Sequence, residues 1–283
     1  MRILYPLAKR FIAGYNFKSA KPTINKLLED GYEVSIDYVG ELSKTITDCD
    51  KAKLQYIEII NYYRKEKIDI SIKPSQLGLK IDYNLCYMYL SYLAKMAKLR
   101  GHTIRLDMED SSVTFKTIQL ALRLNQRFGN VGVAIQANLY RTKKDLEVLI
   151  KQGVSVRLVK GAYKETGDMA YQAEMDIGAS FFHYAVTLYQ NSTNKPAIAT
   201  HDEELLEDIE DLIPDPNHFE YEFLYGIRRD LQKKFKEKGH KVRIYVPFGE
   251  DWLPYTLRRL KEWKNLKFVI KNIFNEIFRR RSS

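Results

Sequence analysis

The chain has 283 residues, of which 45% are hydrophobic and 29% charged, and its formal net charge is +10. This balance is that of a folded globular protein and excludes a disordered or fibrous chain. Two cysteines, Cys49 and Cys86, cannot supply a disulfide framework or a zinc site, and we expect them to be reduced, packed thiols. No apolar run has the length of a signal peptide or a membrane span, so the sequence predicts a cytoplasmic protein.

Strand signals recur along the chain after a preface over residues 1–30, which we expect to be short and helical. Eight short runs follow it, each rich in β-branched or other apolar residues. Such runs are typical of buried strands. The predicted strands are Val34–Tyr38, Ile68–Lys73, Thr103–Met108, Val131–Gln136, Val154–Val159, Ala197–Thr200, Phe219–Leu224 and Val242–Val246.

A longer stretch with helical spacing of apolar residues follows each strand. In the third stretch, Ser111 is the expected N-cap, and Phe115, Ile118, Leu122 and Leu124 are expected to point inward. The predicted helices are Lys51–Lys65, Asn84–Arg100, Ser111–Phe128, Thr142–Gln152, Asp168–Gln190, Asp202–Leu212, Arg228–Lys238 and Tyr255–Lys264.

The alternation of strand and helix predicts the fold class. Strict β-then-α order indicates a parallel sheet with crossover helices, and eight repeats favour a closed (βα)8 barrel of the TIM type. An open doubly wound sheet would need fewer units and a glycine-rich first turn, and no G-x-G-x-x-G motif is present. We therefore predict one domain over residues 1–283, with a barrel core over about residues 34–264.

The last tenth of the chain holds most of the excess positive charge. From Arg258 onward there are nine Lys or Arg and two Glu, which is 9 − 2 = +7. Residues 266–281 are predicted to form an extra basic amphipathic helix with one apolar face: Leu266, Val269, Ile270, Ile273, Phe274, Ile277 and Phe278. Such a helix packs on the barrel or lies at a membrane surface, and no nucleic-acid-binding signature accompanies it.

Polar residues gather where the predicted strands end, which is where barrel enzymes carry their chemistry. Lys73, Asp107, Gln136 and Arg157 lie at or near successive strand ends. A charged arginine inside VSVRLVKGAY is costly to bury and needs a strong partner. We expect Lys73 and Asp107 to form a buried pair, and Arg157 to be either functional or held in a structural salt bridge with Asp107.

Two further features bear on the kind of chemistry. His201 follows the sixth strand, but none of the five histidines has metal-ligand spacing, so we predict no metal site. Arg258 and Arg259 lie on the last predicted barrel helix. Two guanidinium groups suit a small carboxylic acid, although adjacent arginines on a helix are also common as an exposed surface pair.

Seven segments, taken in chain order, resemble the strand-end motifs of the proline dehydrogenase family. They are SIKPSQLGL, RLDMEDS, VAIQANL, VRLVKGAYKE, ATHD, EFLYGIR and RIYVPFGEDWLPYTLRRL. The resemblance covers about residues 34–264 and includes the proline dehydrogenase domain of proline utilisation A. It implies a distorted (βα)8 barrel that binds FAD and oxidises L-proline to Δ1-pyrroline-5-carboxylate, the first step of proline catabolism.

The resemblance also implies roles for individual residues. Arg157 would contact the flavin N5 region, and Asp107 would position Lys73. Glu41 would pair with Arg258 as a gate. The remaining cofactor contacts would be Met108, Gln136, Lys160, Gly161, Ala162, Thr200 and His201. The proline carboxylate would bind Lys73, Arg258 and Arg259, and the proline ring would pack against Leu224, Tyr245 and Tyr255, with Tyr163 nearby.

The base that deprotonates the substrate amine is water or Asp107, and water is preferred. By resemblance, hydride passes to the flavin, electrons go on to a membrane quinone, and a separate pyrroline-carboxylate dehydrogenase consumes the product. Alternatives are a hydroxyproline-oxidising variant, a non-flavin barrel lyase or aldolase with Lys73 or Lys160 as Schiff-base lysine, and a non-catalytic membrane- or nucleic-acid-binding protein driven by the basic C-terminus.

Overall fold

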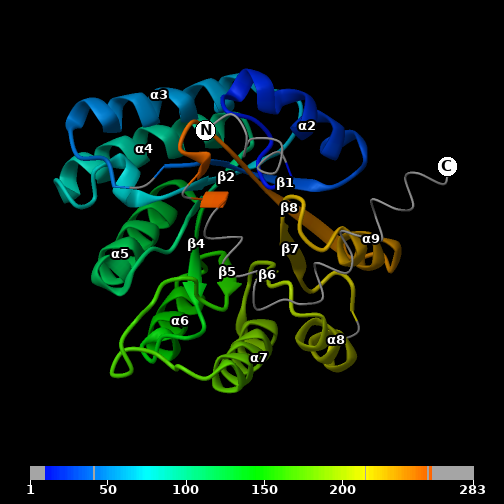
Figure 1. Ribbon diagram of the computed structural model, residues 1–283. Coiled ribbons are helices and arrows are strands. Elements are labelled where there is room, and N and C mark those ends of the chain that lie inside the picture. The colour runs from blue at the N-terminus through cyan, green and yellow to red at the C-terminus, as the bar shows by residue number, and fades with distance from the viewer. Residues whose placement is uncertain (1–9, 41, 214, 254, 257–283) are drawn as a thin grey trace.

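Eight parallel strands close into a barrel in the computed structural model, which describes residues 10–256 except positions 41, 214 and 254 (Figure 1). Each strand pairs with its neighbours in sequence, and β1 pairs with β8 to close the ring. This confirms the predicted TIM-type barrel. The strands are β1 (Glu33–Tyr38), β2 (Asp69–Ile72), β3 (Thr103–Leu106), β4 (Val131–Gln136), β5 (Val156–Val159), β6 (Ala197–Ala199), β7 (Glu220–Leu224) and β8 (Lys241–Phe248).

Helices surround the barrel, one after each of the first seven strands (Figure 1). Tyr255–Lys264, the predicted eighth helix, extends beyond the described residues, and the predicted terminal helix 266–281 lies wholly outside them. The helices after the strands are α3 (Ile46–Tyr62), α4 (Tyr83–Leu99), α5 (Ser111–Phe128), α6 (Thr142–Lys151), α7 (Glu174–Asn191), α8 (Glu203–Leu212) and α9 (Arg229–Glu237), with a short 3₁₀ helix η1 (Pro74–Leu77) before α4.

Three local expectations about the helices were wrong. The N-cap of α5 is Asp110, whose carboxylate accepts the Ser112 amide at 3.1 Å, so Ser111 is already helical. Phe115 is 57% exposed because the buried face of α5 runs along residues 114, 117, 118, 121 and 124, and Phe115 lies beside it. Helix α7 begins at Glu174 rather than Asp168, because the chain before it forms a loop that bridges back to Leu139.

The predicted N-terminal helical segment packs on the outside of the barrel. Helix α2 (Phe17–Glu29) packs against both β1 and β8, and in Figure 1 it lies between α3 and α9. The Phe17 ring is 5.7 Å from the ring of Phe248 on β8. An N-terminal segment therefore covers the seam where the barrel closes.

Strand alternation separates an apolar outer face from a polar inner face. In β2, Ile70 and Ile72 belong to the hydrophobic core between strands and helices. The residues between them, Asp69 and Ser71, both contact Ser35 of β1, whose hydroxyl lies 2.8 Å from the Asp69 carboxylate and 2.9 Å from the Ser71 hydroxyl. Successive strand residues point to opposite faces, so these polar groups line the barrel interior.

The barrel interior is charged over much of its height. Barrels of this class usually fill that space with layers of Val, Ile and Leu. Here Arg243 donates to Glu220 at 2.9 Å, and Arg105 lies 3.5 Å from Asp69. These four residues are buried, so their charges stabilise one another in place of water.

Both cysteines are buried free thiols, as expected. Within residues 10–256, gaps aside, no helix is long and apolar enough to cross a bilayer.

Candidate functional site

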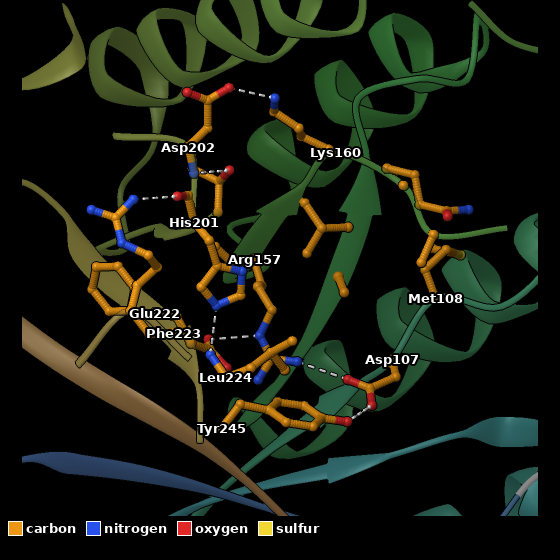
Figure 2. Close-up of a pocket in the computed structure, with 18 of the residues that line it drawn as sticks. Asp107, Met108, Arg157, Lys160, His201, Asp202, Glu222, Phe223, Leu224 and Tyr245 are labelled. Carbon is orange, nitrogen blue, oxygen red and sulfur yellow. Dashed lines mark hydrogen bonds and ion pairs between the residues drawn. The ribbon is translucent and has the colours of Figure 1, made fainter. Parts of the chain in front are cut away.

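One large cavity opens at the carboxyl ends of the strands (Figure 2). Its volume is about 1070 Å³, just above the ~300–1,000 Å³ usual for ligand sites. All predicted site residues in the described part of the chain line this cavity. They are Lys73, Asp107, Met108, Gln136, Arg157, Lys160, Gly161, Ala162, Tyr163, Thr200, His201, Leu224, Tyr245 and Tyr255. Glu41, Arg258 and Arg259 lie outside the described residues.

Arg157 lies at the centre of the cavity floor and reaches strands on the opposite side of the barrel. Its Nε donates to Glu222 at 2.7 Å, and its Nη1 donates to Asp107 at 2.7 Å from the other side (Figure 2). Nη2 contacts Ser35, Asp69 and Ser71 at 2.9–3.3 Å. Although burial opposes the charge, the surrounding carboxylates raise the pKa of Arg157 above its usual value. The salt bridge with Asp107, which the sequence left as the alternative to a functional role, is present within a larger network.

Lys73 is held between two carboxylates, which confirms the expected buried pair. Its Nζ lies 2.8 Å from Asp37 and 3.3 Å from Asp107, and only 7% of the residue is exposed. Burial opposes the charge, yet both carboxylates raise the pKa of Lys73 well above its ordinary value. Burial raises the pKa of Asp37, and the Lys73 ammonium counteracts this only in part. The cavity floor therefore carries a fixed cation.

Tyr245 joins the lysine and arginine networks. Its hydroxyl donates to Asp107 at 2.6 Å and lies 3.4 Å from Lys73 Nζ, and the Arg157 guanidinium lies 5.2 Å from the centre of its ring. Burial and the nearby carboxylates raise the pKa of Tyr245 well above its ordinary value, so its proton stays on the phenol. Leu224 of β7 is in register with Tyr245 of β8, so both side chains meet at the same wall.

A second part of the cavity follows strands β4 to β6. Lys160 Nζ pairs with Asp202 at 2.7 Å, and the Gln136 side chain donates to the Glu109 carbonyl at 3.1 Å. Gly161 has φ +116°, and a β-carbon there would lie 2.2 Å from the Asn138 side chain. Only glycine fits this turn, which brings the backbone close to the cavity.

The segment after β6 is fixed by its own hydrogen bonds. The ring of His201 accepts the Leu224 amide at 3.0 Å, and the Thr200 hydroxyl accepts the Asp202 amide at 3.2 Å. Asp202 also caps α8 through the Leu205 amide at 3.3 Å. A negative residue at this helix start complements the helix dipole.

Two buried acids of the site were missed by the sequence reasoning. Asp37 holds Lys73, and Glu222 holds Arg157. A signal for both existed, because Ser35 and Asp37 alternate along β1, and Glu220 and Glu222 alternate along β7. Polar residues two apart in an otherwise apolar strand indicate a polar inner face.

This arrangement defines the class of protein. Buried ionic side chains from several strands converge on one large cavity at the carboxyl ends of a (βα)8 barrel, which is where enzymes of this fold carry their active sites. Among the described residues there is no group of three or more His, Cys, Asp or Glu side chains placed to hold a metal ion. The site is thus that of a barrel enzyme built on fixed charges.

Comparison with known proteins identifies the family. The proline dehydrogenase family matches residues 20–271, so the chain belongs to this family and is an oxidoreductase acting on proline. It is 32% identical over 276 residues to proline dehydrogenase 1 of Bacillus subtilis subsp. natto, across 95% of this chain and 91% of that protein. It is 33% identical over 282 residues to the proline dehydrogenase of Deinococcus radiodurans, with the same two coverages.

A solved structure shares the fold. Proline utilization A from Bdellovibrio bacteriovorus, inactivated by N-propargylglycine, aligns with a TM-score of 0.82 at 24% identity. The alignment covers 91% of this chain and 33% of that longer chain. At this identity the likeness bears on the fold alone, and it agrees with the closed barrel described above.

Proposed function

We propose that this chain oxidises L-proline to Δ1-pyrroline-5-carboxylate with FAD as its cofactor and a quinone as the electron acceptor. The observation that carries this proposal is the convergence of the predicted cofactor and substrate residues on one cavity. The product would pass to a separate pyrroline-carboxylate dehydrogenase.

The part of the cavity along β4 to β6 fits FAD. Gly161 lines this part of the cavity in a turn packed against Asn138, and Lys160 offers a cation for a diphosphate. Arg157 offers a buried positive charge at the floor, and its Nε, Nη1 and Nη2 all donate to side chains of the barrel. The residues proposed to hold FAD are Met108, Gln136, Arg157, Lys160, Gly161, Ala162, Thr200 and His201. When bound, FAD would supply the acceptor for the hydride that leaves proline C5.

The other part of the cavity suits a small ring with a carboxylate. The Lys73 ammonium is a fixed positive charge on the floor, and Arg258 and Arg259 are proposed to complete the carboxylate site. Tyr245, Tyr255 and Leu224, with Tyr163 nearby, line the same cavity and offer apolar surface to the ring. Holding a rigid substrate at both ends fixes which hydrogen faces the cofactor, which is the protein's main contribution to hydride transfer. Glu41 is proposed as a gate that pairs with Arg258.

Asp107 is proposed to act by positioning rather than as the base. Its carboxylate accepts from Arg157 at 2.7 Å, Tyr245 at 2.6 Å and Lys73 at 3.3 Å. Three donors occupy three of its about four lone-pair sites and orient the groups that face the substrate. Water is therefore our preferred acceptor for the proton of the substrate amine.

The aldolase alternative is disfavoured by the state of the lysines. A Schiff-base lysine must lose its proton to become a nucleophile. The carboxylates of Asp37 and Asp107 raise the pKa of Lys73, which keeps it protonated, and Lys160 is paired with Asp202. Hydroxyproline remains the alternative substrate, since the same walls and charges would accept its ring.

The proposal is tested by binding measurements on the full chain. Purified protein is expected to bind FAD, and the loaded protein to bind L-proline more tightly than hydroxyproline. Arg258→Met and Arg259→Met are each expected to weaken proline binding by about 2–5 kcal/mol, because each would remove one of the cations proposed to bind the proline carboxylate. Arg64→Met changes an exposed arginine and serves as the control. A protein that takes up no FAD, or two variants with unchanged proline affinity, would contradict the proposal.

Contact with a membrane is a separate proposal, which rests on the basic sequence 266–281. Deletion of residues 266–283 is expected to reduce sedimentation with anionic vesicles. Equal sedimentation of the full chain and the shortened chain would refute it.

A further inference from the structure

Glu222 is a buried acid that the proposed reaction leaves without a role. It lies on β7, lines the cavity and is 3% exposed. Its Oε2 accepts Arg157 Nε at 2.7 Å, while its Oε1 is buried and has no hydrogen-bond partner in the described part of the chain. A buried carboxylate with one unpaired oxygen is costly, so a purely structural role explains it poorly.

Glu222 differs from the other carboxylates around Arg157 in how its contacts are shared. Asp107 also accepts from Lys73 and Tyr245. Asp69 also accepts from Thr103 at 2.6 Å and Ser35 at 2.8 Å. The hydrogen bond of Glu222 goes to Arg157 alone among the contacts of the described chain. Burial raises the pKa of Glu222, and the cation that counteracts this most is Arg157, ahead of Arg105 and Arg243.

Glu222 affects Arg157 in two ways: it orients the guanidinium, and it partly neutralises the positive charge. Glu222 and Asp107 hold the guanidinium from opposite sides, through Nε and Nη1, and so fix its plane in the cavity (Figure 2). Loss of the Glu222 bond frees the Nε side. Loss of the Glu222 charge alone leaves the guanidinium in place, but its positive charge is then less neutralised. Because water screens charges poorly in a buried site, this positive charge acts more strongly on the cavity.

We propose that Glu222 is a positioning residue for Arg157 and lowers the reduction potential of FAD bound in this cavity. The inference rests on the proposed function, since it needs FAD at the Arg157 end. A negative charge beside the cofactor disfavours the addition of electrons. A neutral side chain of the same shape at position 222 should therefore raise the potential.

Glu222→Gln is the decisive variant because it keeps the shape and an oxygen that can accept from Arg157 Nε. Glu222→Asp keeps the charge and shortens the side chain. Glu237→Gln removes an exposed acid that pairs with Lys233 on α9 and serves as the control. Thermal unfolding of each variant without FAD first establishes that it is folded. The midpoint potential of each FAD-loaded protein is then measured by titration against a redox dye.

Glu222→Gln is expected to favour two-electron reduction at least tenfold, which is an upward shift of ~30 mV or more. Glu222→Asp and Glu237→Gln are expected to change the equilibrium constant less than threefold. If Glu222→Gln does not bind FAD, the test rests on Glu222→Asp. A tenfold change in the equilibrium constant for FAD reduction in that variant would overturn the inference.

The inference also fails if Glu222→Gln has the wild-type potential or a lower one while the wild-type protein binds FAD and is reduced by L-proline. Failure of the wild-type protein to bind FAD would instead contradict the proposed function, so the two failures are distinguishable.

Discussion

Replacing Lys73 by methionine is expected to destabilise the fold strongly, and the cause lies in its neighbours. The substitution removes a buried ammonium that lies 2.8 Å from Asp37 and 3.3 Å from Asp107. Asp107 keeps Arg157 and Tyr245 as donors, whereas one oxygen of Asp37 is already buried without a hydrogen-bond partner. Removing one member of a buried ion pair costs about 3–5 kcal/mol, because the other charge stays buried.

The stability lost in Lys73→Met depends on pH. The protonation of Asp37 decides whether this loss grows or shrinks as pH rises. Burial already raises the pKa of Asp37, and loss of the Lys73 ammonium raises it further. A carboxyl whose pKa is higher in the folded state than in the unfolded state makes stability fall as pH rises above its ordinary value of about 3.9 and through the folded value. The Lys73→Met variant should therefore be closer to wild type at pH 5 than at pH 8.

Urea unfolding of the protein without FAD, followed by circular dichroism at both pH values, measures this loss. Lys233→Met is the matched control, because Lys233 is exposed and its ion pair with Glu237 spans 3.5 Å. That change should cost at most about 1 kcal/mol. A Lys73→Met variant as stable as this control at pH 8 would refute the reasoning.

Two further predictions concern backbone shape and acid stability. Gly161→Ala should destabilise the protein by about 1–3 kcal/mol and weaken FAD binding, because of its φ of +116° and the clash with Asn138. Gly178→Ala, at an open position in α7, should instead stabilise by about 0.5–1 kcal/mol, and equal thermal shifts in the two variants would contradict this account. Burial lowers the pKa of His102, so the unfolded chain takes up an extra proton below about pH 6.5 and wild-type stability should fall there. His102→Gln should reduce that fall by up to about 1.4 kcal/mol per pH unit, and parallel urea-midpoint curves from pH 7 to 5 would argue against it.

The order and approximate bounds of the strands were predictable because each strand leaves a short apolar run. For example, Val131–Gln136 was predicted and found with the same limits. The strand ends also identified Lys73, Asp107, Gln136 and Arg157, since parallel strands bring their carboxyl ends to one rim, whereas the other predicted lining residues came from the family resemblance. Helix faces were less certain, because one residue of error rotates a side chain by about 100°, as Phe115 shows.

The ion pairs inside the barrel could not be predicted from the sequence in the same way. Arg157 of β5 contacts residues on β1, β2 and β7, and these contacts exist only once the barrel has closed. A sequence marks Glu222 and Asp37 as polar residues within strands but does not say which distant cation each one meets. The place of α2 across the β8–β1 seam likewise depends on tertiary packing and carries no local signal.

The central claim is that this cavity oxidises L-proline with FAD. Anaerobic titration of the FAD-loaded full chain with L-proline, followed by flavin absorbance, tests it most directly. We predict that L-proline bleaches the flavin and that pyrroline-carboxylate forms in equal amount. A flavin that stays oxidised at saturating L-proline, in protein shown to bind both molecules, would contradict the claim.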